Sequence, residues 1–263
     1  IYANAVLVAD FTNLNPNAGP TNLTLTQEKI FAADAAQKTI YSLDLKSQLA
    51  TAINLVGQNI SRLDFPNLDK NNNISYFNAG SIIVFDAKTE KLSVLEIDYP
   101  AKTKKIINFK QYNNRYYLAD GLNRQIYRFV KSGSKLTGAT AWLNSPEDLN
   151  EVTSLEIDGN VHLLKNNGEI LQYSKGKKQE FSLPAIEPNF SRAAKLIISE
   201  KQNYLYILEP AGQRLAVFDK KGNFINQYES DKFNDLKDVQ IDEANIKIYF
   251  LNSAAVYSID MAN

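Results

Sequence analysis

Short apolar segments of four to six residues recur along the whole chain and are bounded by Gly, Asn or Asp. The aliphatic and aromatic residues in these segments favour β-strands, and the polar residues between them favour turns. The strands follow one another in a fixed order, which we label A, B, C and D. Strands A are predicted at 22–26, 61–65, 105–109, 153–157, 194–199 and 237–241, strands B at 30–34, 75–78, 116–120, 161–165, 205–209 and 248–252, and strands C at 39–44, 81–86, 125–130, 169–174, 214–219 and 255–260.

Strands B and C each recur at a step of about 44 residues, six times over. Repeats of four antiparallel strands with this spacing are typical of a β-propeller. The sequence therefore predicts an all-β, six-bladed β-propeller in which residues 1–263 form one domain. The sixth repeat ends after its strand C, while residues 4–10 offer a spare strand. We expect this N-terminal strand to complete the last blade and close the sheet edge.

Composition narrows the function classes. Lys plus Arg and Asp plus Glu both number 29, so the net charge is zero and we expect no nucleic-acid partner. There is no cysteine, which excludes disulfides, a thiolate nucleophile and cysteine-bound metal. No apolar run approaches the roughly 20 residues that span a bilayer. The absence of cysteine fits either side of a membrane.

Two repeats carry a recognisable pattern. The segments "YYLADGLNRQIYRF" (116–129) and "RLAVFDKKGNF" (214–224) place Asp, Asn and Arg before an apolar strand, and Asp and a glycine turn after it. This arrangement resembles the NHL repeat. The matching residues are Asp120, Asn123, Arg124, Phe129, Arg214, Phe218, Asp219 and Gly222. The other four repeats match less well: repeats one and two lack the Arg, and repeat four has Lys165 and Gly168 instead.

The resemblance implies a non-catalytic binding or sensor module, often the extracytoplasmic part of a larger, membrane-anchored chain. We therefore predict a monomer that is not an enzyme, lies outside the cytoplasm or at the cell surface, and recognises a protein, peptide or glycan. The alternative is a calcium-dependent hydrolase or lactonase, because some related six-bladed propellers have that activity.

The connections from strand D to the next strand A are long, at 9–21, 97–104, 142–152, 183–193 and 228–236. Long loops on a rigid scaffold often carry binding residues, and aromatic and Arg side chains often anchor interfaces. In the alternative interpretation, the aromatic side chains only pack beneath their own loops. From these connections and the A-strand starts we predict a ligand-binding face of Arg62, Trp142, Phe190, Arg192, Lys195 and Phe233.

Candidate catalytic groups are few. His162 is the only histidine, and it takes the place of an aromatic residue in its strand B, which argues against a histidine-based triad or metal cluster. Asp34, Asn78, Asp120, Glu209 and Asn252 end successive strands B. Their oxygens suit Ca²⁺, but Asp and Asn also cap turns with the same atoms. We predict turn capping and no cofactor, with Ca²⁺ as the alternative.

Lysine occurs in every complete C–D turn. Such lysines are usually solvated and protect sheet edges. If a membrane anchor precedes the chain, however, this face lies near lipid headgroups that would attract it. The lysines are Lys46, Lys88, Lys91, Lys131, Lys135, Lys175, Lys177, Lys178, Lys220 and Lys221.

Overall fold

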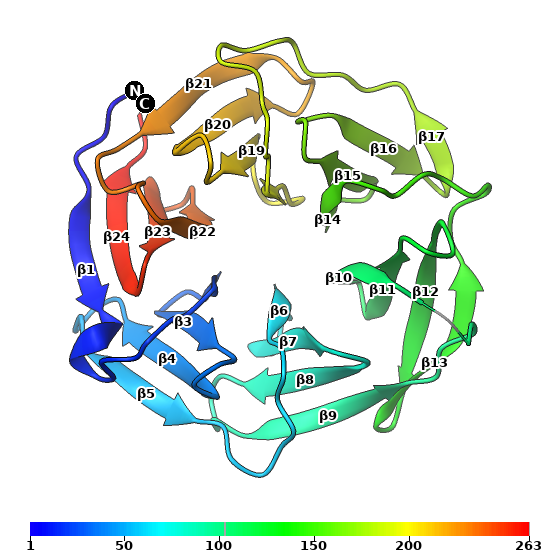
Figure 1. The fold of residues 1–263 in the computed structure, drawn as a ribbon, viewed down its shortest axis with the longest axis horizontal. Coiled ribbons are helices and arrows are strands. Elements are labelled where there is room, and N and C mark those ends of the chain that lie inside the picture. The colour runs from blue at the N-terminus through cyan, green and yellow to red at the C-terminus, as the bar shows by residue number, and fades with distance from the viewer. Residues whose placement is uncertain (103, 263) are drawn as a thin grey trace. The chain divides into compact units, whose positions relative to one another are not determined.

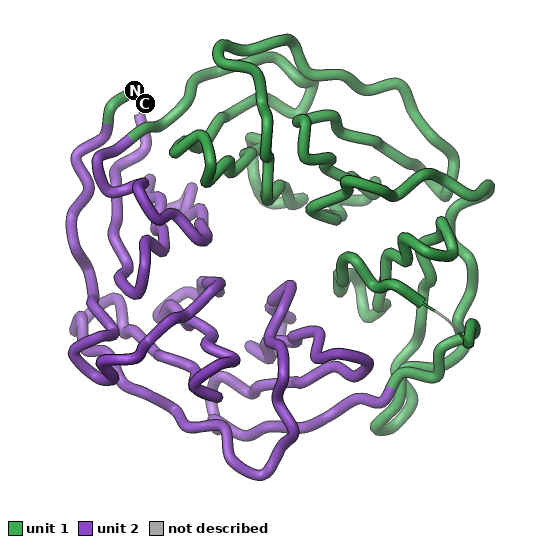
Figure 2. The backbone as a smooth tube through the Cα atoms, in the orientation of Figure 1, with its two compact units in different colours: residues 1–2, 97–229 green, residues 3–96, 230–263 purple. Residues whose placement is uncertain are grey.

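The protein is described by a computed structural model that covers residues 1–102 and 104–262. It is an all-β chain in which the described residues contain a single short 3-10 helix, η1 (Phe11–Asn13). Contacts divide the chain into two compact units, unit 1 (residues 1–2 and 97–229) and unit 2 (residues 3–96 and 230–263) (Figure 2). Each unit holds the strands of three sequence repeats.

Unit 2 contains repeats one, two and six (Figure 1). Consecutive strands pair antiparallel within each repeat. The strands are β2 (Asn22–Leu25), β3 (Lys29–Asp34), β4 (Thr39–Asp44) and β5 (Ala50–Asn54); β6 (Asp64–Leu68), β7 (Asn73–Asn78), β8 (Ser81–Asp86) and β9 (Leu92–Ile97); and β22 (Leu236–Asp242), β23 (Lys247–Asn252) and β24 (Ala255–Asp260).

The N-terminal strand completes the sixth repeat. Strand β1 (Val6–Asp10) pairs antiparallel with β24, and the sheet order is β1-β24-β23-β22 (Figure 1). The expectation that the spare strand closes the last sheet is confirmed. A register shift between Leu7 and Ala9 bends β1 and leads the chain into η1, where Asp10 caps the helix and Phe11 is buried.

Unit 1 contains repeats three, four and five, again with antiparallel neighbours. The strands are β10 (Ile106–Tyr112), β11 (Arg115–Asp120), β12 (Gln125–Ser132) and β13 (Lys135–Ala141); β14 (Val152–Ile157), β15 (Val161–Lys165), β16 (Ile170–Ser174) and β17 (Lys177–Gln179); and β18 (Lys195–Ile197), β19 (Tyr204–Glu209), β20 (Arg214–Asp219) and β21 (Phe224–Glu229).

Repeats one, four, five and six each form a four-stranded sheet, and the strands of repeats two and three are antiparallel neighbours within their own repeat. The repeated antiparallel four-strand pattern is therefore confirmed, whereas six separate sheets are not observed. The single-domain assignment of residues 1–263 stays a prediction. In the described part of the chain no helix is long and apolar enough to cross a membrane.

Apolar clusters fill the spaces between successive repeats within each unit. In unit 2, Phe31 of repeat one packs edge-on against Phe85 of repeat two, and Phe11 stacks on Tyr41 at 4.8 Å. Strands B are buried on both faces, and strands C over part of their length, where repeats of the same unit cover them. This burial explains their apolar runs. Burying each such side chain contributes about 1.5–3 kcal/mol.

Candidate functional site

An open cleft of about 450 Å³ lies entirely within unit 2. Its walls come from the connection between β1 and β2, the start of β22, and the turn between β23 and β24. Ala18, Pro20, Ala254, Ala255 and Tyr257 supply the apolar part of the lining. Asp10, Thr12, Asp235, Lys237, Asn252 and Ser253 supply most of its polar groups. The volume lies within the range of small-molecule sites.

Asp235 contacts two other polar side chains of the cleft. Its Oδ1 lies 2.9 Å from the Lys237 ammonium, and its Oδ2 accepts a hydrogen bond of 2.8 Å from the Ser253 hydroxyl. These two contacts, with Lys237 the larger influence, hold the pKa of Asp235 below its ordinary value. The side chain is about half exposed. Asp235 is therefore an ionised, solvent-accessible carboxylate beside one ammonium and one hydroxyl.

Asp10 is the second carboxylate of the cleft. Its Oδ1 accepts hydrogen bonds from the backbone N–H of Thr12 at 2.9 Å and from the Thr12 hydroxyl at 2.6 Å. These bonds satisfy the first turn of η1, as an aspartate before a helix commonly does. Within the described residues, Oδ2 of Asp10 has no hydrogen-bond partner. It is therefore available to a ligand.

A repeated contact fixes the cleft walls. At the end of strand B, a side-chain oxygen accepts a backbone N–H from the connection that precedes strand A of the same repeat. We call this contact the clamp. It joins Gly19 to Asp34, Ser61 to Asn78, Lys105 to Asp120, Ser191 to Glu209 and Asp235 to Asn252, at N–O distances of 2.7, 2.9, 3.0, 2.7 and 2.8 Å.

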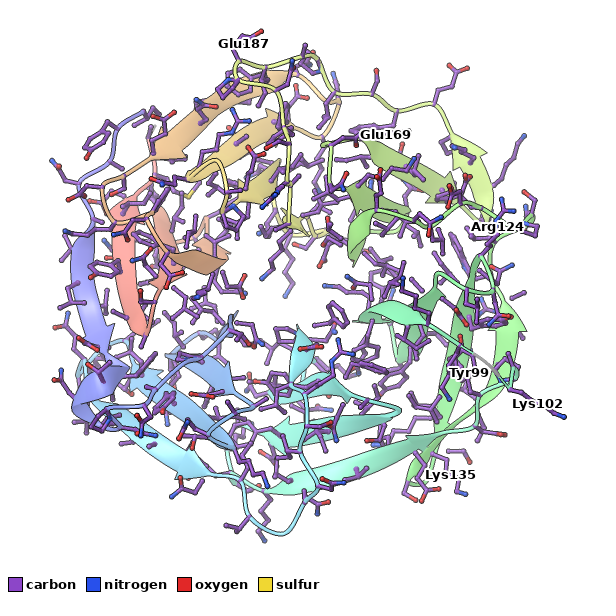
Figure 3. The ribbon with its side chains drawn as sticks, viewed as in Figure 1. Tyr99, Lys102, Arg124, Lys135, Glu169 and Glu187 are labelled. Atoms are coloured by element: carbon purple, nitrogen blue, oxygen red, sulfur yellow. The ribbon has the colours of Figure 1, made fainter. Side chains whose placement is uncertain are left out.

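Two of the five clamped residues, Gly19 and Asp235, line the cleft. Asp34 and Asp120 also accept N–H groups of the following turn, as the capping interpretation predicted. In repeat three the hydroxyl of Tyr99, labelled in Figure 3, adds a 2.7 Å bond to Asp120. Burial raises the pKa of Asp120, but the bonds from Asn123, Lys105 and Tyr99 outweigh burial and lower it.

The clamp in repeat five contains a fully buried ion pair. Glu209 and Arg214 have side chains that are each 1% exposed, and Nε of Arg214 donates to Oε2 of Glu209 at 2.8 Å. The guanidinium also lies 4.8 Å from the centre of the Phe190 ring. Burial raises the pKa of Glu209, but the N–H groups of Arg192 and Ser191 and the Arg214 side chain outweigh burial and lower it.

The residues at the ends of strands B do not form a calcium site, because the clamp occupies their side-chain oxygens. The side-chain oxygens there accept N–H groups of the chain itself, so they are not free to surround a cation. Among the described residues, no group of three or more His, Cys, Asp or Glu side chains is placed to hold a metal ion. The residues present do not fit the Ca²⁺ alternative.

His162 lies outside the cleft, in strand β15 of unit 1. It is 2% exposed, its Nε2 lies 2.7 Å from Oδ1 of Asp158, and its ring packs edge-on against Phe181. Its Nδ1 has no partner in the part of the chain that the structure describes. The packing role that the sequence indicated agrees with this position.

The predicted ligand-binding residues are divided between the units. Arg62 and Phe233 belong to unit 2, whereas Trp142, Phe190, Arg192 and Lys195 belong to unit 1. Arg62 is half exposed and forms an ion pair with Asp64. None of the six lines the cleft.

The aromatic residues among the six pack beneath their loops. Phe233 is 1% exposed and contacts Phe250 edge-on at 4.7 Å. Trp142 contacts Tyr117, and Phe190 packs in the apolar cluster around Phe218. Lys195 is half-buried, and the Arg192 backbone N–H bonds to Glu209. The role of these residues in binding stays a prediction.

The sequence located the cleft's segments but not its residues. The connections 9–21 and 228–236 were both predicted to carry binding residues, and both contribute to the cleft. Asp10, Asp235, Lys237 and Ser253 were not singled out, because Asp10 lies far along the chain from the other three and the four form no motif. The pairing of β22 with β23 brings Asp235 and Lys237 beside Ser253, and the pairing of β1 with β24 adds Asp10.

Comparisons with family models and with curated proteins give no match. Several solved structures are similar. A streptogramin B lyase is 14% identical with a TM-score of 0.66, covering 98% of both chains. Virginiamycin B lyase from Staphylococcus aureus is 14% identical with a TM-score of 0.64, covering 98% of this chain and 99% of that one. A gluconolactonase from Xanthomonas campestris is 10% identical with a TM-score of 0.70, covering 99% of this chain and 90% of that one.

These likenesses correct the functional prediction. The prediction of a non-catalytic binding or sensor module, and with it the prediction that the chain is not an enzyme, is contradicted because the similar structures include lyases and a gluconolactonase. The finding favours the alternative of a propeller enzyme. At these identities the comparisons show the fold, which is that of the β-propeller class.

Proposed function

We propose that this chain is an enzyme that hydrolyses an ester or lactone bond of a small substrate bound in the cleft. The observation that carries the proposal is the contact of Asp235 with both Lys237 and Ser253 on the cleft wall. A hydrolase needs a proton acceptor and a positive group close together, and these side chains supply both. The likeness of the fold to a gluconolactonase supports the choice of bond.

The groups divide the reaction between them. Water attacks the carbonyl carbon, and the Asp235 carboxylate accepts a proton from that water. The Lys237 ammonium stabilises the negative charge that develops on the carbonyl oxygen. Protonated Asp235 returns this proton to the leaving alkoxide as the ester bond breaks, which gives a carboxylic acid and an alcohol. The acid then releases its own proton to solvent and becomes a carboxylate. Ser253 keeps the Asp235 carboxylate oriented through its 2.8 Å hydrogen bond.

Hydrolysis fits the cleft better than a histidine-dependent elimination. A histidine-to-alanine variant of the virginiamycin B lyase is catalytically inactive. The only histidine of this chain is His162, which lies buried in unit 1 and not in the cleft. The cleft therefore offers a carboxylate base without an imidazole.

The proposal is tested by proton release from a panel of lactones, with gluconolactone first. Because general-base catalysis contributes about 10²–10⁴-fold, we expect Asp235→Asn to lose most of the hydrolysis rate. The control is Asp260→Asn, the same change at an exposed ion pair with Lys247 at the other end of β24. It should keep the rate. Equal rates in both variants, or a rate abolished by a chelator, would contradict a site built on Asp235 and Lys237.

We also infer that the six sequence repeats correspond to six blades of the NHL-like kind. The support is the match of residues 116–129 and 214–224 to that pattern, together with the contact of Arg214 with Glu209 at the end of the preceding strand. Limited proteolysis checks it, since cuts between blades should fall at the connections and be spaced about 44 residues apart.

A further inference from the structure

We propose that Asp10 makes the cleft selective for neutral, hydroxyl-rich substrates and weakens the binding of their carboxylate products. The inference rests on the proposed function, because it concerns the substrate class of the same site. Asp10 lines the cleft, and among the described residues its side chain forms hydrogen bonds with Thr12 and none with Asp235, Lys237 or Ser253. Its role is therefore separable from the hydrolytic step.

The charge of the cleft is the first argument. Its charged lining residues are Asp10, Asp235 and Lys237, two carboxylates and one ammonium, which leaves a net charge of −1. Lys237 is paired with Asp235 at 2.9 Å, so the charge of Asp10 remains uncompensated there. A further carboxylate, Asp34, accepts a hydrogen bond of 2.7 Å from the N–H of Gly19, which lines the cleft. An anionic ligand is therefore repelled.

Hydrogen bonding is the second argument. Oδ1 of Asp10 is taken up by Thr12, whereas Oδ2 has no hydrogen-bond partner among the described residues. A carboxylate oxygen only accepts hydrogen bonds, so it selects a ligand that donates them, such as a hydroxyl group. The apolar lining at Tyr257 and Ala255 suits the C–H face of a small ring. A hydroxylated ring satisfies both surfaces.

Hydrolysis changes the ligand's charge. A neutral lactone becomes a carboxylate, and the uncompensated charge of Asp10 then opposes the product but not the substrate. A unit charge several ångströms away at a partly solvated site changes an ion's affinity by roughly tenfold. The same side chain thus favours substrate entry over product retention.

The test measures binding, not turnover. Gluconolactam, a neutral ring that resists hydrolysis, and gluconate, its anionic open-chain counterpart, are titrated by NMR. In the unmodified protein we expect gluconate to bind at least about tenfold more weakly than the lactam. Asp10→Asn should reduce this difference by about tenfold, mainly by strengthening gluconate binding. Asparagine also caps helices, so η1 should persist.

The matched control is Asp260→Asn, which removes one negative charge outside the cleft and should leave the difference unchanged. Raising the salt to about 0.5 M should narrow the difference in the unmodified protein. Equal binding of the two probes, no binding of either, or an unchanged difference in Asp10→Asn overturns the inference. If the protein hydrolyses lactones but binds the lactam and gluconate equally, only this inference is wrong. If it discriminates between the two probes but hydrolyses no lactone, only the proposed function is wrong.

Discussion

Removing Arg214 should destabilise the protein strongly. The Arg214 and Glu209 side chains are each 1% exposed, and Nε of Arg214 donates to Oε2 of Glu209 at 2.8 Å. The Nη2 atom approaches the same oxygen at 2.8 Å as an ion-pair contact. Arg214→Met keeps most of the side-chain volume but leaves a buried carboxylate without its cation. Breaking one partner of a buried pair costs about 3–5 kcal/mol.

Urea unfolding followed by circular dichroism measures this loss. The matched control is Lys247→Met, which breaks an exposed pair of similar length with Asp260 at 2.7 Å and should cost about 1 kcal/mol or less. Glu209→Gln and the double variant complete a mutant cycle, in which we expect a coupling of about 2–3 kcal/mol because the residues are in direct contact. Additive losses, or an Arg214→Met loss no larger than the control's, would refute the reasoning.

Three further outcomes are expected. Gly176→Ala should cost several times more stability than Gly133→Ala by thermal unfolding: both have positive φ, but a Cβ at Gly176 would lie 2.2 Å from the Trp142 carbonyl oxygen, whereas nothing lies within 4 Å at Gly133. The lowered pKa of Glu209 adds stability above the ordinary carboxyl pKa of about 4, so urea midpoints should fall as the pH drops below it. Asn252→Leu should reduce lactone hydrolysis, and Asn252→Asp should restore it, because a carboxylate also accepts the clamped N–H.

Most strands could be read from the sequence because burial on both faces leaves a continuous apolar run. Strand β20 occupies the predicted residues 214–219, and β3 differs from its prediction by one residue. The second strand A is the exception, since it begins at Asp64 and not at 61. The N–H groups of Ser61 and Arg62 bond to the Asn78 side chain, so these residues lie in the clamp and outside the ladder.

The site could not be read in the same way, because its side chains are placed by tertiary pairing. Phe233 and Trp142 were selected as aromatic residues on long connections, yet both pack against apolar neighbours. Burial of a loop aromatic stabilises the loop, and a one-dimensional pattern does not separate that case from an exposed anchor. Asp10 and Asp235 line one cleft because β1 pairs with β24, which brings the two ends of the sequence together, and because β22 pairs with β23.

Repeat four lacks the clamp and holds its connection by other contacts. Lys165 replaces the acid or amide there, and the connection before β14 is held differently. Glu147 in that connection accepts bonds from the Tyr173 hydroxyl at 2.7 Å and from Lys178 at 3.3 Å. In repeat four the acidic residue, Glu147, therefore lies in the connection and not at the end of strand B. Its bonds still hold the connection to its own repeat. In every repeat the connection before strand A is therefore held to its own repeat. In repeat six the clamped residue is Asp235, so the same contact also positions the carboxylate that we propose to act in hydrolysis.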